Sequence, residues 1–155
     1  MAGRIDARLA DLGIELPEAA AAVANYVPYV VSGNMVYVAG QITLLGGKPQ
    51  HVGIVGEGLD VEEAQKAARL CALNLIAQVK AACDGDLDRV ARVVKLTGFV
   101  ASAPGFTQQP AVINGASDLM VEVFGDAGRH ARAAVGVIGL PLGVSVEVDG
   151  VFEIS

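Results

Sequence analysis

The clearest pattern in the chain is an alternation of apolar and polar residues near its C-terminal end. Residues 144–154 place apolar side chains at Val144, Val146, Val148, Phe152 and Ile154, and polar ones at Ser145, Glu147, Asp149 and Glu153. A period of two predicts a strand with one buried and one polar face. The apolar run over residues 131–138 predicts the preceding strand, and Leu140-Pro141-Leu142-Gly143 supplies the turn between them.

Three further strands are expected upstream. Tyr29-Val30-Val31 and Met35-Val36-Tyr37-Val38 are β-rich, and Ser32-Gly33-Asn34 between them is typical of a hairpin turn. Residues 93–101 form the third, where Val94, Leu96 and Val100 alternate with Lys95 and Thr97. Residues 42–59 are rich in glycine and predict a long loop or irregular hairpin, without the motif of a phosphate-binding loop.

Apolar residues at helical spacing predict two long helices. Residues 61–82 follow Asp60 as N-cap, with Glu63 placed for a capping box, and their apolar face comprises Ala64, Ala68, Cys71, Leu75 and Val79. Residues 108–124 are bounded by Thr107 as a cap and by Gly125. A short helix is expected over residues 4–12, and a linker over residues 13–25.

This order, β-β-α-β-α-β-β after a short helix, indicates an α+β fold with two helices packed on one face of a mixed sheet. We expect a single domain over residues 1–155, with residues 1–24 as an N-terminal extension. The second face of the sheet must be solvated or buried by another subunit. Because 53% of the residues are hydrophobic, much of this Ala and Val, the second option is favoured and an oligomer is expected.

Charge and leader signals narrow the classes of function. The formal net charge is −6 with a pI of about 4.8, and the 11 Lys and Arg residues form no cluster, which disfavours a nucleic-acid partner. The N-terminus lacks the apolar core of a signal peptide, and no stretch is long enough to span a membrane. A cytoplasmic location is therefore expected. Cys71 and Cys83 form no C-x-x-C pair and are interpreted as small buried hydrophobes.

Arg132 is the strongest candidate for chemistry. It begins an otherwise apolar strand and is flanked by alanines, which leave its fork of donors accessible to a carboxylate. A solvated strand edge, or an ion pair with Glu147, is an equally good explanation of the pattern. His51 and His130 are too few for an ordinary multi-histidine metal site; His51 is interpreted as solvated, and His130 as a structural or surface residue.

Three other residues remain open on pattern alone. Glu147 is a polar residue of the last strand, and Tyr26 stands close before the first hairpin. Asn114 lies mid-helix beside Gly115, a pair with poor helix propensity, which indicates a close contact or a hydrogen-bonding role.

Several segments together resemble the RidA/YjgF family, also described as endoribonuclease L-PSP-like. The run from His130 to Val148, with Arg132-x-x-Val135, Leu140-Pro141 and Val146-Glu147-Val148, is similar to the family signature. Gly33 to Gln41 resembles the family's early strand, in which Ala39 replaces the common serine. Tyr26 and Asn114 also match, over about residues 25–154. The longer N-terminus and 42–59 loop fit a divergent, longer branch.

The resemblance implies a chorismate mutase-like fold, a homotrimer, and active clefts between adjacent subunits. It implies hydrolysis of reactive enamines and imines, such as 2-aminoacrylate, to 2-oxo acids and ammonia, as in a 2-iminobutanoate/2-iminopropanoate deaminase. Arg132 would bind the substrate carboxylate, Glu147 would orient or activate water, and Tyr26 would line the cleft. Gly40, Asn114 and Ala134 complete the expected substrate contacts; Ala134 replaces a common cysteine or serine.

No metal or organic cofactor is expected, because the imine carbon is already electrophilic and needs only positioning and a placed water. The alternative is a non-catalytic module of the same fold that binds a small carboxylate metabolite. An endoribonuclease activity, which attaches to the family by name, is disfavoured by the acidic pI, and a chorismate mutase activity is disfavoured because fold does not carry function.

Overall fold

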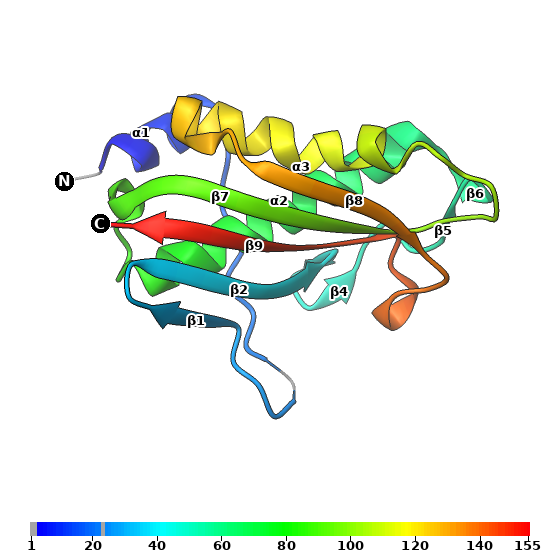
Figure 1. The fold of residues 1–155 in the computed structure, drawn as a ribbon, viewed down its shortest axis with the longest axis horizontal. Helices are drawn as coiled ribbons and strands as arrows, with labels where there is room; N and C mark the ends of the chain where they lie inside the picture. The colour runs from blue at the N-terminus through cyan, green and yellow to red at the C-terminus, as the bar shows by residue number, and fades with distance from the viewer. Residues whose placement is uncertain (1–2, 23) are drawn as a thin grey trace.

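Five strands form one mixed sheet, and the helices pack on one of its two faces (Figure 1). The structure is a computed structural model that describes residues 3–22 and 24–155. The strand order is β1-β2-β9-β7-β8, in which β7 and β8 are parallel and the other neighbours are antiparallel. The expected α+β fold with helices on one face of a mixed sheet is confirmed.

The long elements lie close to their predicted positions. They are β1 (Tyr29–Ser32), β2 (Met35–Ile42), α2 (Val61–Ala82), β7 (Val90–Ala101), α3 (Gln109–Phe124), β8 (Ala131–Val137) and β9 (Val146–Ile154). The shorter elements are α1 (Arg4–Asp11), the 3-10 turns η1 (Leu87–Arg89), η2 (Gly125–Gly128) and η3 (Pro141–Gly143), and four two-residue strands in the glycine-rich segment: β3 (Leu44–Leu45), β4 (Lys48–Pro49), β5 (Ile54–Val55) and β6 (Gly58–Leu59). In the described part of the chain, no helix is long and apolar enough to cross a membrane.

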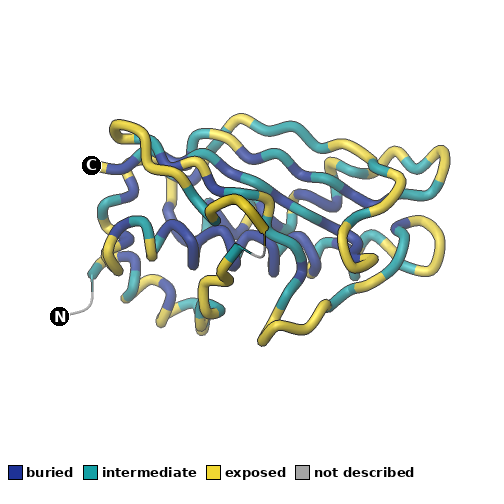
Figure 2. The backbone as a smooth tube through the Cα atoms, turned by 90° about the horizontal axis from the view of Figure 1, so that it is seen from below, coloured by how far each residue is buried: buried dark blue, intermediate teal, exposed yellow. Residues whose placement is uncertain are grey.

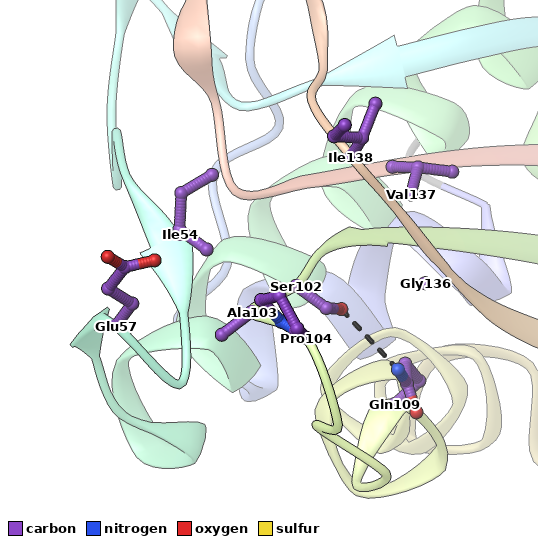
Figure 3. A pocket seen from close by; sticks show the side chains of 9 residues that line it. All are labelled: Ile54, Glu57, Ser102, Ala103, Pro104, Gln109, Gly136, Val137 and Ile138. Carbon is purple, nitrogen blue, oxygen red and sulfur yellow. Dashed lines mark hydrogen bonds between the residues drawn. The ribbon is translucent and has the colours of Figure 1, made fainter.

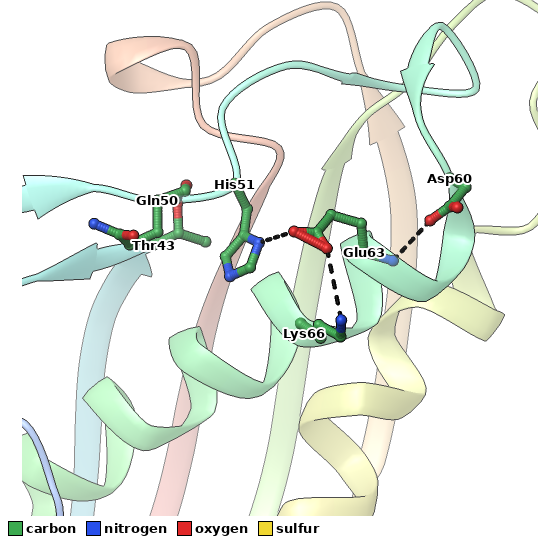
Figure 4. Close-up of polar contacts among 6 residues, drawn as sticks. All are labelled: Thr43, Gln50, His51, Asp60, Glu63 and Lys66. Atoms are coloured by element: carbon green, nitrogen blue, oxygen red, sulfur yellow. Dashed lines mark hydrogen bonds and ion pairs between the residues drawn. The ribbon is translucent and has the colours of Figure 1, made fainter.

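Helix α2 forms the centre of the core. Its predicted apolar face, Ala64, Ala68, Cys71, Leu75 and Val79, is fully buried. Asp60 caps the helix, because its carboxylate accepts a hydrogen bond of 2.8 Å from the backbone N–H of Glu63. The second arm of a capping box does not form: the Glu63 side chain instead contacts the His51 ring, with 3.0 Å between Oε1 and Nδ1 (Figure 4). His51 was expected to be solvated, but this contact anchors the glycine-rich loop to α2.

Helix α3 packs unusually close to α2 at Gly115. A Cβ at this position would lie 2.1 Å from the Gln65 carbonyl oxygen, so only glycine allows the two helices to approach this far. The prediction that Thr107 caps α3 is wrong, since Gln108 is the N-cap residue and makes no side-chain capping bond. Pro110 in the first turn has no N–H and reduces the number of donors that need a cap.

The two faces of the sheet differ in burial, and buried residues therefore alternate with less buried ones along the strands (Figure 2). On β9, Val146, Val148 and Phe152 are fully buried toward the helices, whereas Glu147 and Asp149 point to the opposite face. On that opposite face, which we call the open face, Tyr37 of β2 is 49% exposed and Val135 of β8 is 45% exposed. Large apolar side chains are therefore left at the surface of the isolated chain. Ser145, expected on the polar face, is instead completely buried just before β9 begins.

Candidate functional site

Arg132 lies on the edge strand β8 and points toward helix α3. Its Cα pairs with that of Leu96, which is fully buried, so the two side chains share the helix-covered face of the sheet. Nη1 donates to Asn114 Oδ1 at 2.8 Å and to Ser117 Oγ at 3.1 Å, and Nη2 donates to the Pro110 carbonyl at 3.3 Å. Positions 110, 114 and 117 recur at helical spacing, so one face of α3 forms the whole cradle.

A hydrogen-bonded chain continues from this cradle to the end of η2. The His130 Nδ1 lies 2.7 Å from the Gly128 carbonyl oxygen, which can only accept, so Nδ1 carries the proton. The other ring nitrogen, Nε2, lies 2.9 Å from Ser117 Oγ. In the neutral ring, the Ser117 hydroxyl donates to Nε2 while its oxygen accepts from Arg132. His130 is thus structural, as expected, but the element that it supports is the cradle of Arg132.

No carboxylate pairs with Arg132 among residues 3–22 and 24–155. The alternative interpretation, an ion pair with Glu147, is therefore wrong. All three groups that hold the guanidinium are neutral oxygens, so they fix its position without neutralising its charge. This is the arrangement required of a cation that must bind an anion from outside the chain.

Glu147 lies on the open face of the sheet, beside a bulge in β2. The register of β2 against β9 shifts between Val38 and Gln41, and Gly40 falls in this bulge. A Cβ at Gly40 would stand 2.5 Å from the Glu147 carboxylate oxygen Oε2, so glycine is needed here for space. The sequence did not predict that Gly40 and Glu147 are neighbours; Gly40 was expected only as a substrate contact, and that role stays a prediction.

Two carboxylates of the open face have raised pKa values. Burial raises the pKa of Glu147 above its usual range, and the negative charge of nearby Asp149 raises it further. Burial likewise raises the pKa of Asp149, although hydrogen bonds from Thr97 and the charge of Lys95 oppose this. A carboxylate with a raised pKa is a stronger base once ionised, which suits a residue that takes a proton from water.

The sheet separates Arg132 from Glu147. Glu147 pairs with Phe99, which pairs with Val135, three residues beyond Arg132 on the same strand. Because successive side chains of a strand alternate, Arg132 and Val135 point to opposite faces. Strand β9 also lies two positions from β8 in the sheet, about 10 Å at ordinary strand spacing. One small ligand cannot contact both side chains of the same chain.

Two other residues were predicted for the site: one lies on the same face as Arg132, and the other lies apart from both Arg132 and Glu147. Ala134 shares the helix-covered face with Arg132 and packs against the core. Tyr26 precedes β1, at the opposite edge of the sheet from β8, and is 55% exposed. Sequence reasoning missed Ser117, although its position three residues after Asn114 places both on one face of α3. The part of the chain that the structure describes holds no group of three or more His, Cys, Asp or Glu that could bind a metal ion.

Comparison with known proteins identifies a family and several relatives of this chain. The family described as "YjgF/chorismate mutase-like, putative endoribonuclease" matches residues 6–149. Protein TCP17 of Trypanosoma cruzi is 53% identical over 154 residues, 99% of this chain and 96% of that protein. The crystal structure of Atu1372 from Agrobacterium tumefaciens, a protein of unknown function, is 54% identical with a TM-score of 0.91, covering 97% of this chain and 92% of that one. RidA from the Antarctic bacterium Psychrobacter sp. PAMC 21119 is 28% identical with a TM-score of 0.61, covering 88% and 94%.

Proposed function

Because this chain belongs to the RidA/YjgF family, we propose that it is a deaminase that hydrolyses reactive imines and enamines of amino acids to 2-oxo acids and ammonia. The observation that carries this proposal is the neutral cradle of Arg132. Three uncharged oxygens fix the guanidinium, and among the described residues no acid consumes its charge. The site is therefore prepared for a small anionic ligand.

The donors that remain on Arg132 match a carboxylate. The two hydrogens of Nη1 and one hydrogen of Nη2 are used by Asn114, Ser117 and Pro110. The Nε–H and the second Nη2 hydrogen have no acceptor among the described residues. Two such donors can bind both oxygens of a carboxylate, and bidentate charge-assisted bonds of this kind are strong and specific in orientation. A 2-imino acid carries its carboxylate next to the reactive carbon, so this contact also positions the reacting atom.

Glu147 supplies the base. In the proposed reaction, a water molecule attacks the imine carbon, a C–O bond forms, and Glu147 takes one proton from that water. The C=N π bond breaks as the C–O bond forms, and Glu147 returns this proton to the nitrogen to give the carbinolamine. The carbinolamine hydroxyl then passes its proton to the nitrogen by way of Glu147, so that the C–N bond breaks, the C=O bond forms, and the products are the 2-oxo acid and ammonia. The raised pKa of Glu147, caused by burial and by Asp149, supports both the uptake and the return of the proton.

Two copies of the chain are needed to bring the groups together. Arg132 and Glu147 lie on opposite faces of one sheet, so the proposed cleft combines Arg132 of one subunit with Glu147 and Gly40 of another. The apolar side chains left at the open face, among them Tyr37 and Val135, provide a surface for that contact. In this arrangement, a homotrimer as in the resemblance, Ala134 borders the ligand and Tyr26 contributes to the wall of the cleft.

The test uses imines produced in situ by an L-amino-acid oxidase, with the release of ammonia and 2-oxo acid followed over time. Wild-type protein should accelerate release, and Arg132→Ala should reduce kcat/KM about 100-fold through the loss of the charge-assisted bonds. Arg129→Ala is the matched control, because Arg129 is an exposed neighbour whose guanidinium lies near Asp126, with 3.6 Å between Nε and Oδ1. Equal rates for wild type and Arg132→Ala would refute the assignment.

A binding measurement on the same wild-type and Arg132→Ala proteins distinguishes an enzyme from a non-catalytic binding module. Binding of a stable 2-oxo acid by the wild type, measured by calorimetry and lost in Arg132→Ala, without any acceleration of imine hydrolysis, would assign the chain to the non-catalytic alternative.

A further inference from the structure

A cavity of about 450 Å³ opens where the C-terminal ends of β7 and β8 meet the start of α3 (Figure 3). Its walls include Ser102, Ala103, Gln109, Gly136, Val137 and Ile138. None of the residues predicted for the site lines it.

The cavity depends on Gly136. The backbone there does not have the positive φ that favours glycine, so its role is space rather than backbone freedom. A Cβ at this position would lie 2.8 Å from Gln109 Nε2 and 3.2 Å from Ser102 Oγ. Both polar side chains are held in place: Gln109 Nε2 donates to the Phe106 carbonyl at 2.9 Å, and Ser102 Oγ donates to the Val100 carbonyl at 2.8 Å.

This cavity adjoins the cradle of Arg132. Along β8, positions 132, 134 and 136 project from the same face of the strand. Beyond the guanidinium, these positions carry only the methyl group of Ala134 and the hydrogen of Gly136. On α3, Gln109 immediately precedes Pro110, whose carbonyl oxygen accepts from Arg132 Nη2. Gln109 lines the cavity and its neighbour Pro110 holds Arg132, so the cavity and the cradle share the first turn of α3, and the side chain of a ligand bound to Arg132 lies near the cavity.

The residues that line the cavity determine which kind of side chain it can bind. Apolar carbon lines most of the cavity, from Ala103, Val137 and Ile138, and the Gln109 amide is a neutral polar group. The only charged side chain among the lining residues is Glu57, which repels a second carboxylate and which no lining Lys or Arg offsets. Such a site accepts an extended apolar side chain and rejects an acidic one of the same length.

We propose that this cavity binds the side chain of the substrate, and that the chain therefore acts best on 2-imino acids with long, uncharged side chains rather than on 2-aminoacrylate or other three-carbon imines. This inference rests on the proposed function and specifies its substrate class.

The experiment compares imines formed by the oxidase from alanine, methionine and glutamate. Burial of the additional methionine side-chain atoms should raise kcat/KM for the methionine-derived imine about tenfold or more above that for the alanine-derived one. The glutamate-derived imine, of similar length but acidic, should not exceed the alanine-derived one. Measurable acceleration with equal kcat/KM for all three would overturn the side-chain site and leave the deaminase proposal intact.

Two variants test the side-chain cavity directly, and stable 2-oxo acids test it independently of catalysis. Gly136→Val should bring the methionine-to-alanine ratio toward one, whereas Gly139→Val, at a position with open space around it, should keep the wild-type ratio. If no imine is hydrolysed faster, the proposed deaminase fails, and calorimetry with 2-oxo acids still decides the binding inference. Tighter binding of 4-methylthio-2-oxobutanoate than of pyruvate supports the cavity as a side-chain site, and equal affinities refute it.

Discussion

Arg132 and Glu147, the two main candidate residues, differ greatly in how firmly the chain holds their side chains. On the helix-covered side, Arg132 receives three hydrogen-bond acceptors from α3, and Ser117 connects it to His130. On the open side, Glu147 is half-buried and its side chain makes no hydrogen bond to the described residues, although Gly40 and Asp149 lie close to it. Arg132 is thus held in place within its own chain, whereas Glu147 is not. This difference is what the proposed site between two subunits requires.

The largest expected contrast comes from placing the same charge on each face of the sheet. Val100→Asp puts an unpaired carboxylate into the core of β7, where Val100 is fully buried, and should reduce the free energy of unfolding by about 4 kcal/mol. Val135→Asp puts it on the open face and should leave a folded, cooperatively unfolding chain while it dissociates the oligomer. Urea denaturation and analytical ultracentrifugation measure the two effects. An intact oligomer in Val135→Asp would show that this face is not the interface.

Mixed oligomers test directly whether Arg132 and Glu147 act from different subunits. Arg132→Ala and Glu147→Gln homo-oligomers should each be nearly inactive. Co-expressed in equal amounts, they should regain about a quarter of wild-type activity, because in a closed ring one cleft in four receives Arg132 from one neighbour and Glu147 from the other. Ammonia release by the purified mixture is the measurement. No activity above that of the single variants would place both groups in one subunit or outside the reaction.

A smaller effect is expected from the support of the cradle. Ser117→Ala removes one acceptor from Arg132 Nη1 and breaks the link to His130, so the guanidinium should be less well positioned. We expect KM for an imine to rise about fivefold with kcat nearly unchanged, in keeping with the loss of one hydrogen bond.

Two variants control for a general loss of structure. Ser117→Thr retains the hydroxyl and should restore the wild-type KM, and Ser32→Ala, in the exposed strand β1, should not alter it. A fall in kcat with constant KM would assign Ser117 a different role.

The smallest expected effect is a shift in the pH profile. Catalysis requires ionised Glu147, so the rate should fall as the pH decreases through its raised pKa. Burial and the charge of Asp149 both raise that pKa, and Asp149→Asn removes the second cause. The pKa of Glu147 should then decrease, and the acidic limb of kcat/KM should move to lower pH. Asp126→Asn, which alters an exposed carboxylate, is the control. A limb that stays in place or moves upward would exclude Glu147 as the base.

Most elements were predictable because local patterns determine them. The face of α2, the alternation in β9 and the turn at Gly33 and Asn34 all follow from spacing and residue type. The prediction failed where a long-range contact changed a local rule. In β7, the register against β9 shifts between Val93 and Lys95, so Val93 is buried and Val94 is only partly buried, contrary to the simple alternation.

For the candidate site too, local sequence patterns indicated some features, and only the packing showed the others. The sequence pattern alone identified Arg132 and Asn114 as residues with unusual positions, since an arginine among alanines and an asparagine beside a mid-helix glycine both depart from local preference. Glu147 was open on pattern alone and became a candidate through the family resemblance. The sequence could not show that Asn114 and Ser117 hold the guanidinium, because those contacts span 18 and 15 residues and depend on how α3 packs beside β8.

The sequence by itself determined the order of the long strands and helices, the apolar faces of α2 and β9, and the presence of an arginine whose donors suit a carboxylate, because periodicity and side-chain chemistry are local properties. Only the tertiary structure decided which residues meet. Pairing of β7 with β8 and β9 places Arg132 and Glu147 on opposite faces of one sheet. The close approach of α2 and α3 at Gly115 belongs to the same packing, in which three neutral oxygens of α3 surround the guanidinium. Such contacts arise from packing between distant segments, which no local pattern encodes.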